Sequence, residues 1–203
     1  FIWHNSAKLP GPAEWVTKKR IRVTDSWTHL WWFSNSESPK ANNKNVLVPY
    51  SDGMKTLLRK QSYNAGDRPS GHRISEQGFL TDNSGAIPRS FLEGHGVESG
   101  EEGYTTTSLV SGNTTLDPLY RDWCLTNGIK SHPATMSPLV CEFFIKFLTE
   151  QKDLVFDPFG GSCTTGASAE YLKRKWVCVE SNETYLQGAL GRFQQGMSGE
   201  SNR

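Results

Sequence analysis

The chain has 203 residues, a mass of 22.7 kDa and a formal net charge of +1, with 35% hydrophobic residues. This size suits one domain with an embedded module and is large enough for a buried core. The longest apolar runs are far shorter than a bilayer span and no signal peptide is visible, which argues against a membrane or secreted protein. The cysteines form neither a C-x-x-C pair nor a disulfide framework and are expected to be reduced thiols in the cytoplasm: Cys124, Cys141, Cys163 and Cys178.

Charge is distributed unevenly along the chain. Residues 1–75 carry 12 Lys and Arg against 5 Asp and Glu, whereas residues 76–128 carry 2 against 8. A basic amino-terminal third in a neutral protein is typical of a local polyanion site, with a solvated basic face as the alternative. The chain starts at Phe1 and not at Met, so we interpret it as a fragment or as a chain without its natural beginning.

The first third predicts a β-hairpin over residues 18–34. Ile21 and Val23 alternate with charged residues, and a turn and a run of strand-forming residues follow. Upstream, a loop containing prolines leads into a short helix that is expected to open at Glu14.

Residues 35–130 have weak periodicity and many Gly, Ser, Asn and Pro residues, which indicates a loop-rich insertion. One short helix is predicted at Asp52–Lys60, and the stretch 94–115 is expected to be mobile.

Periodic order returns after residue 130. Ser137 followed by Pro138 is a good helix start, and apolar residues then recur at helical spacing up to Leu148. Residues 183–193 predict a closing amphipathic helix, and the tail 194–203 is expected to be disordered.

Residues 153–180 contain the most informative pattern. An apolar strand ends on Asp157, and a glycine-rich loop and a helix-compatible stretch up to Lys173 come next. A second apolar strand, Trp176–Val179, then ends on Glu180. This order predicts a β-loop-α-β unit that binds a nucleoside cofactor, because an acid about 20 residues past the glycines suits ribose hydroxyls.

Two details favour S-adenosylmethionine over a dinucleotide. The loop lacks the G-x-G-x-x-G spacing that places a helix amino terminus against a pyrophosphate. It also has Asp157 just before the glycines, where a carboxylate would repel a pyrophosphate and attract the ammonium group of methionine. The alternative is a glycine-rich turn between buried elements.

These segments resemble one family, the bacterial DNA methyltransferases that modify exocyclic amino groups, in the permuted order called class β. They are most similar to cytosine-N4 enzymes of the PvuII methyltransferase kind. The likeness rests on DPFGGSCTT (157–165) as the glycine-loop motif, VCVE (177–180) as the next strand, HPATMSPLVCEFFIKFLT (132–149) as the methionine-side motif, RPSGHRIS (68–75) in the target-recognition region, and the hairpin strands between residues 3 and 34. Family members usually have a glycine where Cys163 stands.

The resemblance implies an α/β fold: part of a Rossmann-like S-adenosylmethionine-dependent methyltransferase sheet with an inserted loop-rich target-recognition region. The implied parts are an edge β-hairpin (1–35), the target-recognition region (36–130), a cofactor-binding β-α-β unit (131–193) and a disordered tail (194–203). The expected cofactor-binding residues are His132, Pro133, Asp157, Phe159, Gly160, Gly161, Ser162, Thr164, Thr165 and Glu180. The expected DNA-binding residues are Lys8, Lys18, Lys19, Arg20, Arg68, Ser70, His72 and Arg73. No metal site is expected, because the histidines lack metal spacing.

No catalytic residue is assigned in this chain. The family's catalytic motif, Ser-Pro-Pro-Tyr or Asp-Pro-Pro-Tyr, is absent from the 203 residues and is expected upstream of Phe1. In that motif a side-chain oxygen and a prolyl carbonyl accept the hydrogens of the amine, while the tyrosine stacks on the base that has left the duplex.

The implied activity is methyl transfer from S-adenosylmethionine to cytosine N4 in a specific site of double-stranded DNA, in the bacterial cytoplasm at the nucleoid. The chain alone is expected to be inactive until an upstream segment or a second chain supplies the catalytic motif. The alternatives are an adenine-N6 enzyme or a non-catalytic DNA-binding remnant. A small-molecule or RNA methyltransferase would share the cofactor unit, but the basic first third and residues 68–75 count against it.

Overall fold

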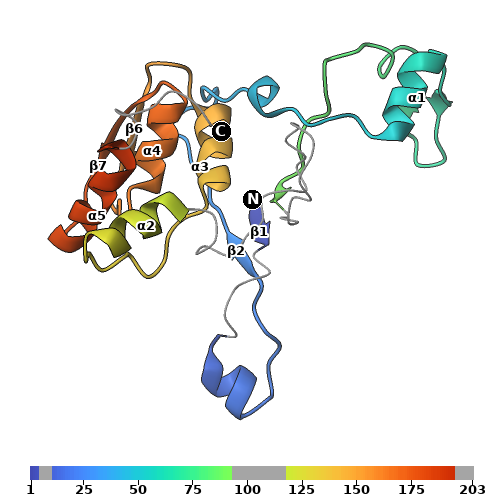
Figure 1. The fold of residues 1–203 in the computed structure, drawn as a ribbon. Helices are drawn as coiled ribbons and strands as arrows, with labels where there is room; N and C mark the ends of the chain where they lie inside the picture. The colour runs from blue at the N-terminus through green and yellow to red at the C-terminus, as the bar shows by residue number, and fades with distance from the viewer. Residues whose placement is uncertain (5–10, 93–117, 195–203) are drawn as a thin grey trace.

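The computed structural model describes residues 1–4, 11–92 and 118–194, which form a mixed α/β structure (Figure 1). Lys8, the mobile stretch expected at 94–115 and residues 195–203 of the expected tail lie outside the described residues. Gln194, the first residue of the tail expected at 194–203, is instead the last residue of a helix. No helix in the described ranges is long and apolar enough to cross a lipid bilayer.

The predicted β-loop-α-β unit is present. Strand β6 (Leu154–Asp157) pairs in parallel with β7 (Lys175–Cys178), and helix α4 (Thr164–Tyr171) connects them. Asp157 is opposite Cys178 in this register, so both strands end at the same edge. The loop after β6 and the acid after β7 therefore lie at one edge of the pair.

Helix α3 (Pro138–Leu148) packs on α4 and covers one face of the two strands. Cys141 and Ile145 of α3 and Ala169 of α4 form a buried cluster against Val155 and Trp176. The helix begins where the sequence predicts, because Ser137 is its N-cap residue and proline is favoured in the first turn.

Helix α5 (Glu183–Gln194) contacts the same face, since the Phe193 ring stacks on Trp176 with 4.8 Å between centroids. Helix α2 (Pro118–Thr126) packs in turn on α5 (Figure 1). A Cβ on Gly188 would lie 3.0 Å from Cys124 Sγ, and one on Gly191 would lie 2.1 Å from the Trp123 ring. The two glycines thus permit the close approach of α2, a helix that the loop-rich range 36–130 did not predict.

The amino-terminal strands differ from the predicted hairpin. Strand β1 (Ile2–His4) lies between β2 (Trp27–His29), which is antiparallel to it, and β5 (Phe91–Leu92), which is parallel. Ile21 and Val23 belong to no strand and are 67% and 89% exposed, so their assignment to a hairpin strand was wrong. β1 pairs with β2 in their place.

Burial explains this choice of strand. Trp3 of β1 packs with Leu92 of β5 and Val140 of α3 in a buried cluster, whereas Ile21 and Val23 stand among lysines and arginines. Between β1 and β2 lies a short π-helix, η1 (Glu14–Lys18), close to where the sequence predicts a helix start.

A separate projection contains helix α1 (Asp52–Lys60), whose bounds match the prediction (Figure 1, right). It follows a 3-10 helix, η2 (Asn43–Val46), and is closed at its base by an antiparallel bridge between Val48 and Ala86. Within it β3 (Gly66–Asp67) pairs with β4 (Arg73–Ile74) in a small hairpin.

Candidate functional site

The loop between β6 and α4 is tied to the ends of both strands. The Gly160 N–H donates to the Val179 carbonyl at 2.7 Å, and the Val179 N–H donates to the Asp157 carbonyl at 2.9 Å. The Asp157 carboxylate accepts the Phe159 N–H at 2.9 Å, which turns the chain sharply after the strand. These bonds hold the backbone of the loop at the carboxyl edge of the strands.

Two glycines in this loop are required by its geometry. Gly161 has a φ of +53°, in the left-handed region, and a Cβ there would lie 3.2 Å from His132 Nε2. A Cβ on Gly160 would lie 3.0 Å from the Cβ of Cys178. The two glycines therefore serve the turn itself.

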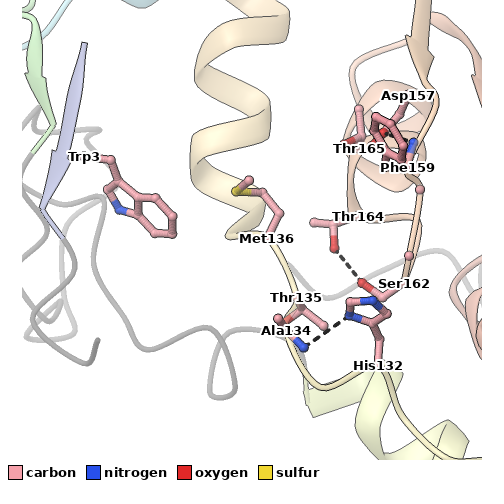
Figure 2. A pocket seen from close by; sticks show the side chains of 12 residues that line it. Trp3, His132, Ala134, Thr135, Met136, Asp157, Phe159, Ser162, Thr164 and Thr165 are labelled. Atoms are coloured by element: carbon pink, nitrogen blue, oxygen red, sulfur yellow. Dashed lines mark hydrogen bonds between the residues drawn. The ribbon is translucent and has the colours of Figure 1, made fainter. Parts of the chain in front are cut away.

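A pocket of about 400 Å³ lies between this loop and the segment before α3 (Figure 2). That volume is within the usual range for small-molecule sites. Of the ten residues expected to bind a cofactor, all but Pro133 and Glu180 line it. The complete lining is Trp3, His132, Ala134, Thr135, Met136, Asp157, Phe159, Gly160, Gly161, Ser162, Thr164 and Thr165.

Four lining residues were not predicted. Ala134, Thr135 and Met136 directly follow the two residues named from the methionine-side motif, so extending that motif would have found them. Trp3 comes from β1, more than 100 positions away, and no spacing in the sequence indicates it. Figure 2 shows the Trp3 ring across the pocket from Ser162 and Thr164.

The carboxylate of Glu180 is engaged with the backbone. Its Oε1 accepts the Asn182 N–H at 2.8 Å, and its Oε2 accepts the Gly161 N–H at 2.8 Å. These hydrogen bonds, that from Asn182 first, lower the pKa of Glu180 below its ordinary value. Glu180 thus fastens the end of β7 to the glycine loop.

The hydroxyls of Ser162 and Thr164 face one another and are only 3% exposed as residues. Their oxygens are 3.1 Å apart, and Arg192 Nη2 donates to both of them at 3.2 Å. The chain itself therefore satisfies both hydroxyls.

His132 is held by its neighbours on the opposite wall. Its backbone N–H donates to Tyr120 Oη at 2.9 Å, and its Nδ1 accepts the Ala134 N–H at 3.2 Å (Figure 2). Its ring meets that of Tyr185 edge to face, with 4.5 Å between centroids. These contacts fix the ring over Gly161.

Burial makes the thiols near the loop poor nucleophiles. It raises the pKa of Cys141 to about 12 and also raises the pKa of Cys163 and Cys178. Cys163 has a φ of +56°, in the region where glycine is most readily accommodated.

The expected DNA-binding residues that the structure describes fall into two groups on different projections (Figure 1). In and after η1, Lys18 and Lys19 lie 3.3 and 3.7 Å from carboxylate oxygens of Glu14. The Lys19 Nζ also lies 4.1 Å from the centre of the Trp15 ring, and Arg20 is exposed.

The second group lies on the β3–β4 hairpin. Arg68 N–H donates to the His72 carbonyl at 2.8 Å, and the Arg68 guanidinium donates to the Asn64 carbonyl. Arg73 is exposed, with its Nε 3.9 Å from Asp67 Oδ1, a weak surface ion pair. Ser70 is exposed at the turn of the same hairpin. The structure therefore brings Arg68, Ser70, His72 and Arg73 together but does not join them to the lysines.

In the part of the chain that the structure describes, no group of three or more His, Cys, Asp or Glu residues is arranged to hold a metal ion.

Comparisons with known proteins show which family the chain belongs to. The chain is 42% identical over 195 residues to the Type II methyltransferase M.PvuII of Proteus hauseri, which covers 95% of this chain and 53% of that protein. It is 37% identical over 65 residues to the Type II methyltransferase M2.LlaDCHI of Lactococcus lactis subsp. cremoris, covering 32% of this chain and 24% of that protein. The solved structure of the PvuII DNA methyltransferase (cytosine-N4-specific) matches with a TM-score of 0.61 and 34% identity, over 95% of this chain and 49% of that one.

The chain thus spans about half the length of M.PvuII. The family model described as DNA methylase (N6_N4_Mtase) matches residues 1–190, nearly the whole chain. On this match the chain belongs to the N6/N4 DNA methylase family.

Proposed function

We propose that this chain is the cofactor-binding and DNA-contacting part of a methyltransferase that moves a methyl group from S-adenosylmethionine to cytosine N4 in a specific DNA site. The observation that carries the proposal is the likeness to M.PvuII over 95% of the chain. The solved relative is described as cytosine-N4-specific.

The pocket has the chemistry that S-adenosylmethionine requires. Asp157 brings a carboxylate suited to the ammonium group of the methionine part. Trp3, Met136 and Phe159 bring apolar surface for the rest of the ligand. Gly161 leaves the loop backbone without a side chain on that wall. When bound, the cofactor supplies a methyl group on a positively charged sulfur.

Glu180 keeps the capacity to bind ribose while it fastens the loop. A carboxylate oxygen accepts two hydrogen bonds, so the Gly161 N–H leaves Oε2 able to accept a hydroxyl hydrogen. Glu180 is ionised near neutral pH, and the charge of its carboxylate strengthens such a bond.

We assign β6, α4 and β7 to a Rossmann-like sheet and the projection that contains α1 to an inserted target-recognition region. Within that projection the β3–β4 hairpin exposes Arg73, a residue type that pairs with guanine in the major groove. In this assignment Lys18 and Lys19, at the end of η1 and directly after it, contact phosphates. The enzyme acts on a base that has left the duplex, in the bacterial cytoplasm at the nucleoid.

A further polypeptide segment is part of the proposal. Apolar side chains occupy alternate positions along β6, along β7 and just beyond the end of β7: Leu154, Phe156, Val177 and Val179. They are 45% to 61% exposed, on the face away from α3 and α4. Parallel strands are normally covered on both faces, so this apolar face is suited to be covered by other helices. We propose that the covering segment carries the catalytic motif, on the same chain or on a second one.

A row of exposed aromatic rings supports the same conclusion. The rings occupy alternate positions along β2 and beyond its end: Trp27, His29, Trp31 and Phe33. The centroids of successive rings are 4.5, 5.7 and 6.3 Å apart. The Trp31 and Phe33 side chains are 77% and 82% exposed, an apolar surface that a neighbouring segment would cover.

The test is methylation by the chain together with a co-expressed segment that bears Ser-Pro-Pro-Tyr. Tritiated S-adenosylmethionine and genomic DNA report transfer, and mass spectrometry of the nucleosides identifies the product. N4-methylcytosine supports the proposal and N6-methyladenine selects the adenine enzyme. If the complex binds both the cofactor and DNA but transfers no methyl group, the chain is a non-catalytic DNA-binding remnant.

A further inference from the structure

Arg192 of helix α5 reaches the glycine loop from behind the pocket. Its Nε donates to the Ser162 carbonyl, and its Nη2 donates to the hydroxyls of Ser162 and Thr164 at 3.2 Å. Hydrogen bonds from a charged guanidinium are stronger than those between neutral groups, and three of them converge on the turn that leads into α4. Arg192 therefore fixes one wall of the pocket.

The same guanidinium lies over an aromatic ring of another helix. Arg192 Cζ is 4.6 Å from the centre of the Tyr120 ring, and Tyr120 is 1% exposed. A cation over an aromatic face is attracted most strongly where water is excluded. The contact therefore couples α2 to α5 at the level of the loop.

Tyr120 in turn holds the opposite wall. Its Oη accepts the backbone N–H of His132 at 2.9 Å, at the start of the segment that runs through Met136 along the pocket. The phenol is protonated at neutral pH, and desolvation raises the pKa of Tyr120 further, to about 12. Arg192 is thus hydrogen-bonded to the glycine loop, and Tyr120, which contacts Arg192, is hydrogen-bonded to the opposite wall of the pocket.

We propose that Arg192 and Tyr120 are positioning residues that set the separation between the glycine loop and the His132–Met136 segment, and through it the affinity for the cofactor. This inference rests on the proposed function for the identity of the ligand. It also makes α2 part of the cofactor site. Gly188 and Gly191 of α5 allow α2 to approach closely, so that Tyr120 of α2 reaches His132.

The chain offers a matched control for Arg192. Arg174 is also a half-buried arginine with three hydrogen bonds, to Thr149 Oγ1, the Thr149 carbonyl and the Leu172 carbonyl. It lies next to Lys175, at the amino ends of the strands, and does not line the pocket. Replacing either arginine by glutamine removes the same group, so both variants are expected to melt at lower temperature.

The experiment measures S-adenosylmethionine affinity by calorimetry, and amide hydrogen exchange at Gly160 and Gly161, in the full 203-residue chain. For Arg192→Gln we expect at least tenfold weaker binding and at least tenfold faster exchange at both amides. For Arg174→Gln we expect changes below about twofold in both quantities at a comparable loss of melting temperature. Arg192→Lys should fall between the unchanged chain and Arg192→Gln, because lysine restores the charge without the planar fork.

Tyr120→Phe tests the two walls independently of each other. It keeps the aromatic ring under Arg192 but removes the oxygen that accepts the hydrogen bond from the His132 backbone N–H. We expect faster exchange at the His132 amide and little change at Gly160 and Gly161. Equal effects of Arg192→Gln and Arg174→Gln on both readouts would overturn the inference. If the unchanged chain fails to bind S-adenosylmethionine, the proposed function fails, and the exchange rates alone then decide whether Arg192 and Tyr120 position the walls.

Discussion

The carboxylate of Glu180 accepts the backbone N–H of Gly161 at 2.8 Å, so the acid after β7 holds the loop that follows β6. The two residues are 19 positions apart and meet because parallel strands end at the same edge. In the proposed function, the acid that binds ribose also shapes the loop that receives the rest of the cofactor. Its replacement should therefore alter the loop as well as the affinity.

Glu180→Ala is expected to weaken S-adenosylmethionine binding by about 30-fold or more, because it removes charge-assisted hydrogen bonds to the ribose and to the loop. Titration calorimetry measures the affinity, and amide exchange at Gly161 reports the loop. Glu183→Ala, at an exposed position in the first turn of α5, is the control and should leave both unchanged. Binding within twofold of the unchanged chain would remove Glu180 from the site.

The Glu180–Gly161 contact should also depend on pH. Hydrogen bonds to the ionised form lower the pKa of Glu180 in the folded chain, so their stabilisation is complete above the pKa of the unfolded chain. It is lost as the pH falls through the lower pKa of the folded chain. The Gly161 amide chemical shift should therefore show a titration step in the acid range. In Glu180→Gln the same titration should be flat, and an unchanged titration there would assign the effect to another group.

Gly161→Ala should lower both stability and cofactor affinity. Alanine at a φ of +53° costs about 1–2 kcal/mol, and its Cβ would press on the His132 ring at 3.2 Å. Chemical denaturation measures the free energy of unfolding and calorimetry the affinity. Gly128→Ala is the matched control, because Gly128 has a φ of +65° with nothing within 4 Å. A comparable loss of stability without loss of binding is expected there, and the same result at Gly161 would favour a purely structural turn.

Local patterns predicted the elements whose causes are local. Apolar runs bounded by acids indicated β6 and β7, and the Ser137-Pro138 start indicated α3, because strand formation and capping depend on neighbouring residues. Ile21 and Val23 had an equally good strand pattern, but they are 67% and 89% exposed, whereas β1 presents Trp3 to the core.

The unpredicted parts depend on distant contacts. Helix α2 is explained by Gly188 and Gly191 of α5, and Trp3 reaches the pocket only because β1 packs near α3. The glycine loop itself was predictable, since most of its expected residues do line the pocket. The engagement of Ser162 and Thr164 by Arg192 was not, because no sequence spacing relates α5 to the loop.

Charge deletion in the two groups of residues that we propose to contact DNA should have different consequences. Replacing Lys18 and Lys19 together by glutamine should weaken binding to all duplexes about equally, because phosphate contacts carry no sequence information. Arg73→Ala should reduce discrimination between specific and random duplexes, as expected of a contact to a base edge. Fluorescence anisotropy with both duplexes measures this, and Lys173→Gln, at an exposed lysine in the turn between α4 and β7, is the control. Equal losses on both duplexes for Arg73→Ala would make it a phosphate contact.

The exposed face of β6 and β7 yields the last prediction, that methyl transfer needs another polypeptide segment. The 203-residue chain alone should transfer no tritium from S-adenosylmethionine to mixed genomic DNA, and an added segment bearing Ser-Pro-Pro-Tyr should restore transfer.

A substitution at Phe156, which is 60% exposed on that face, tests whether the added segment docks there. Phe156→Glu should block the restoration of transfer while cofactor binding persists, because a carboxylate buried at the new interface is strongly unfavourable. Tyr171→Glu, 59% exposed on α4 at the other face, should have little effect on restoration. Robust transfer by the chain alone would place the catalytic groups among its own residues. If Phe156→Glu leaves the restoration of transfer unaffected, the added segment docks on another surface. The aromatic row from Trp27 to Phe33 is then the next surface to alter.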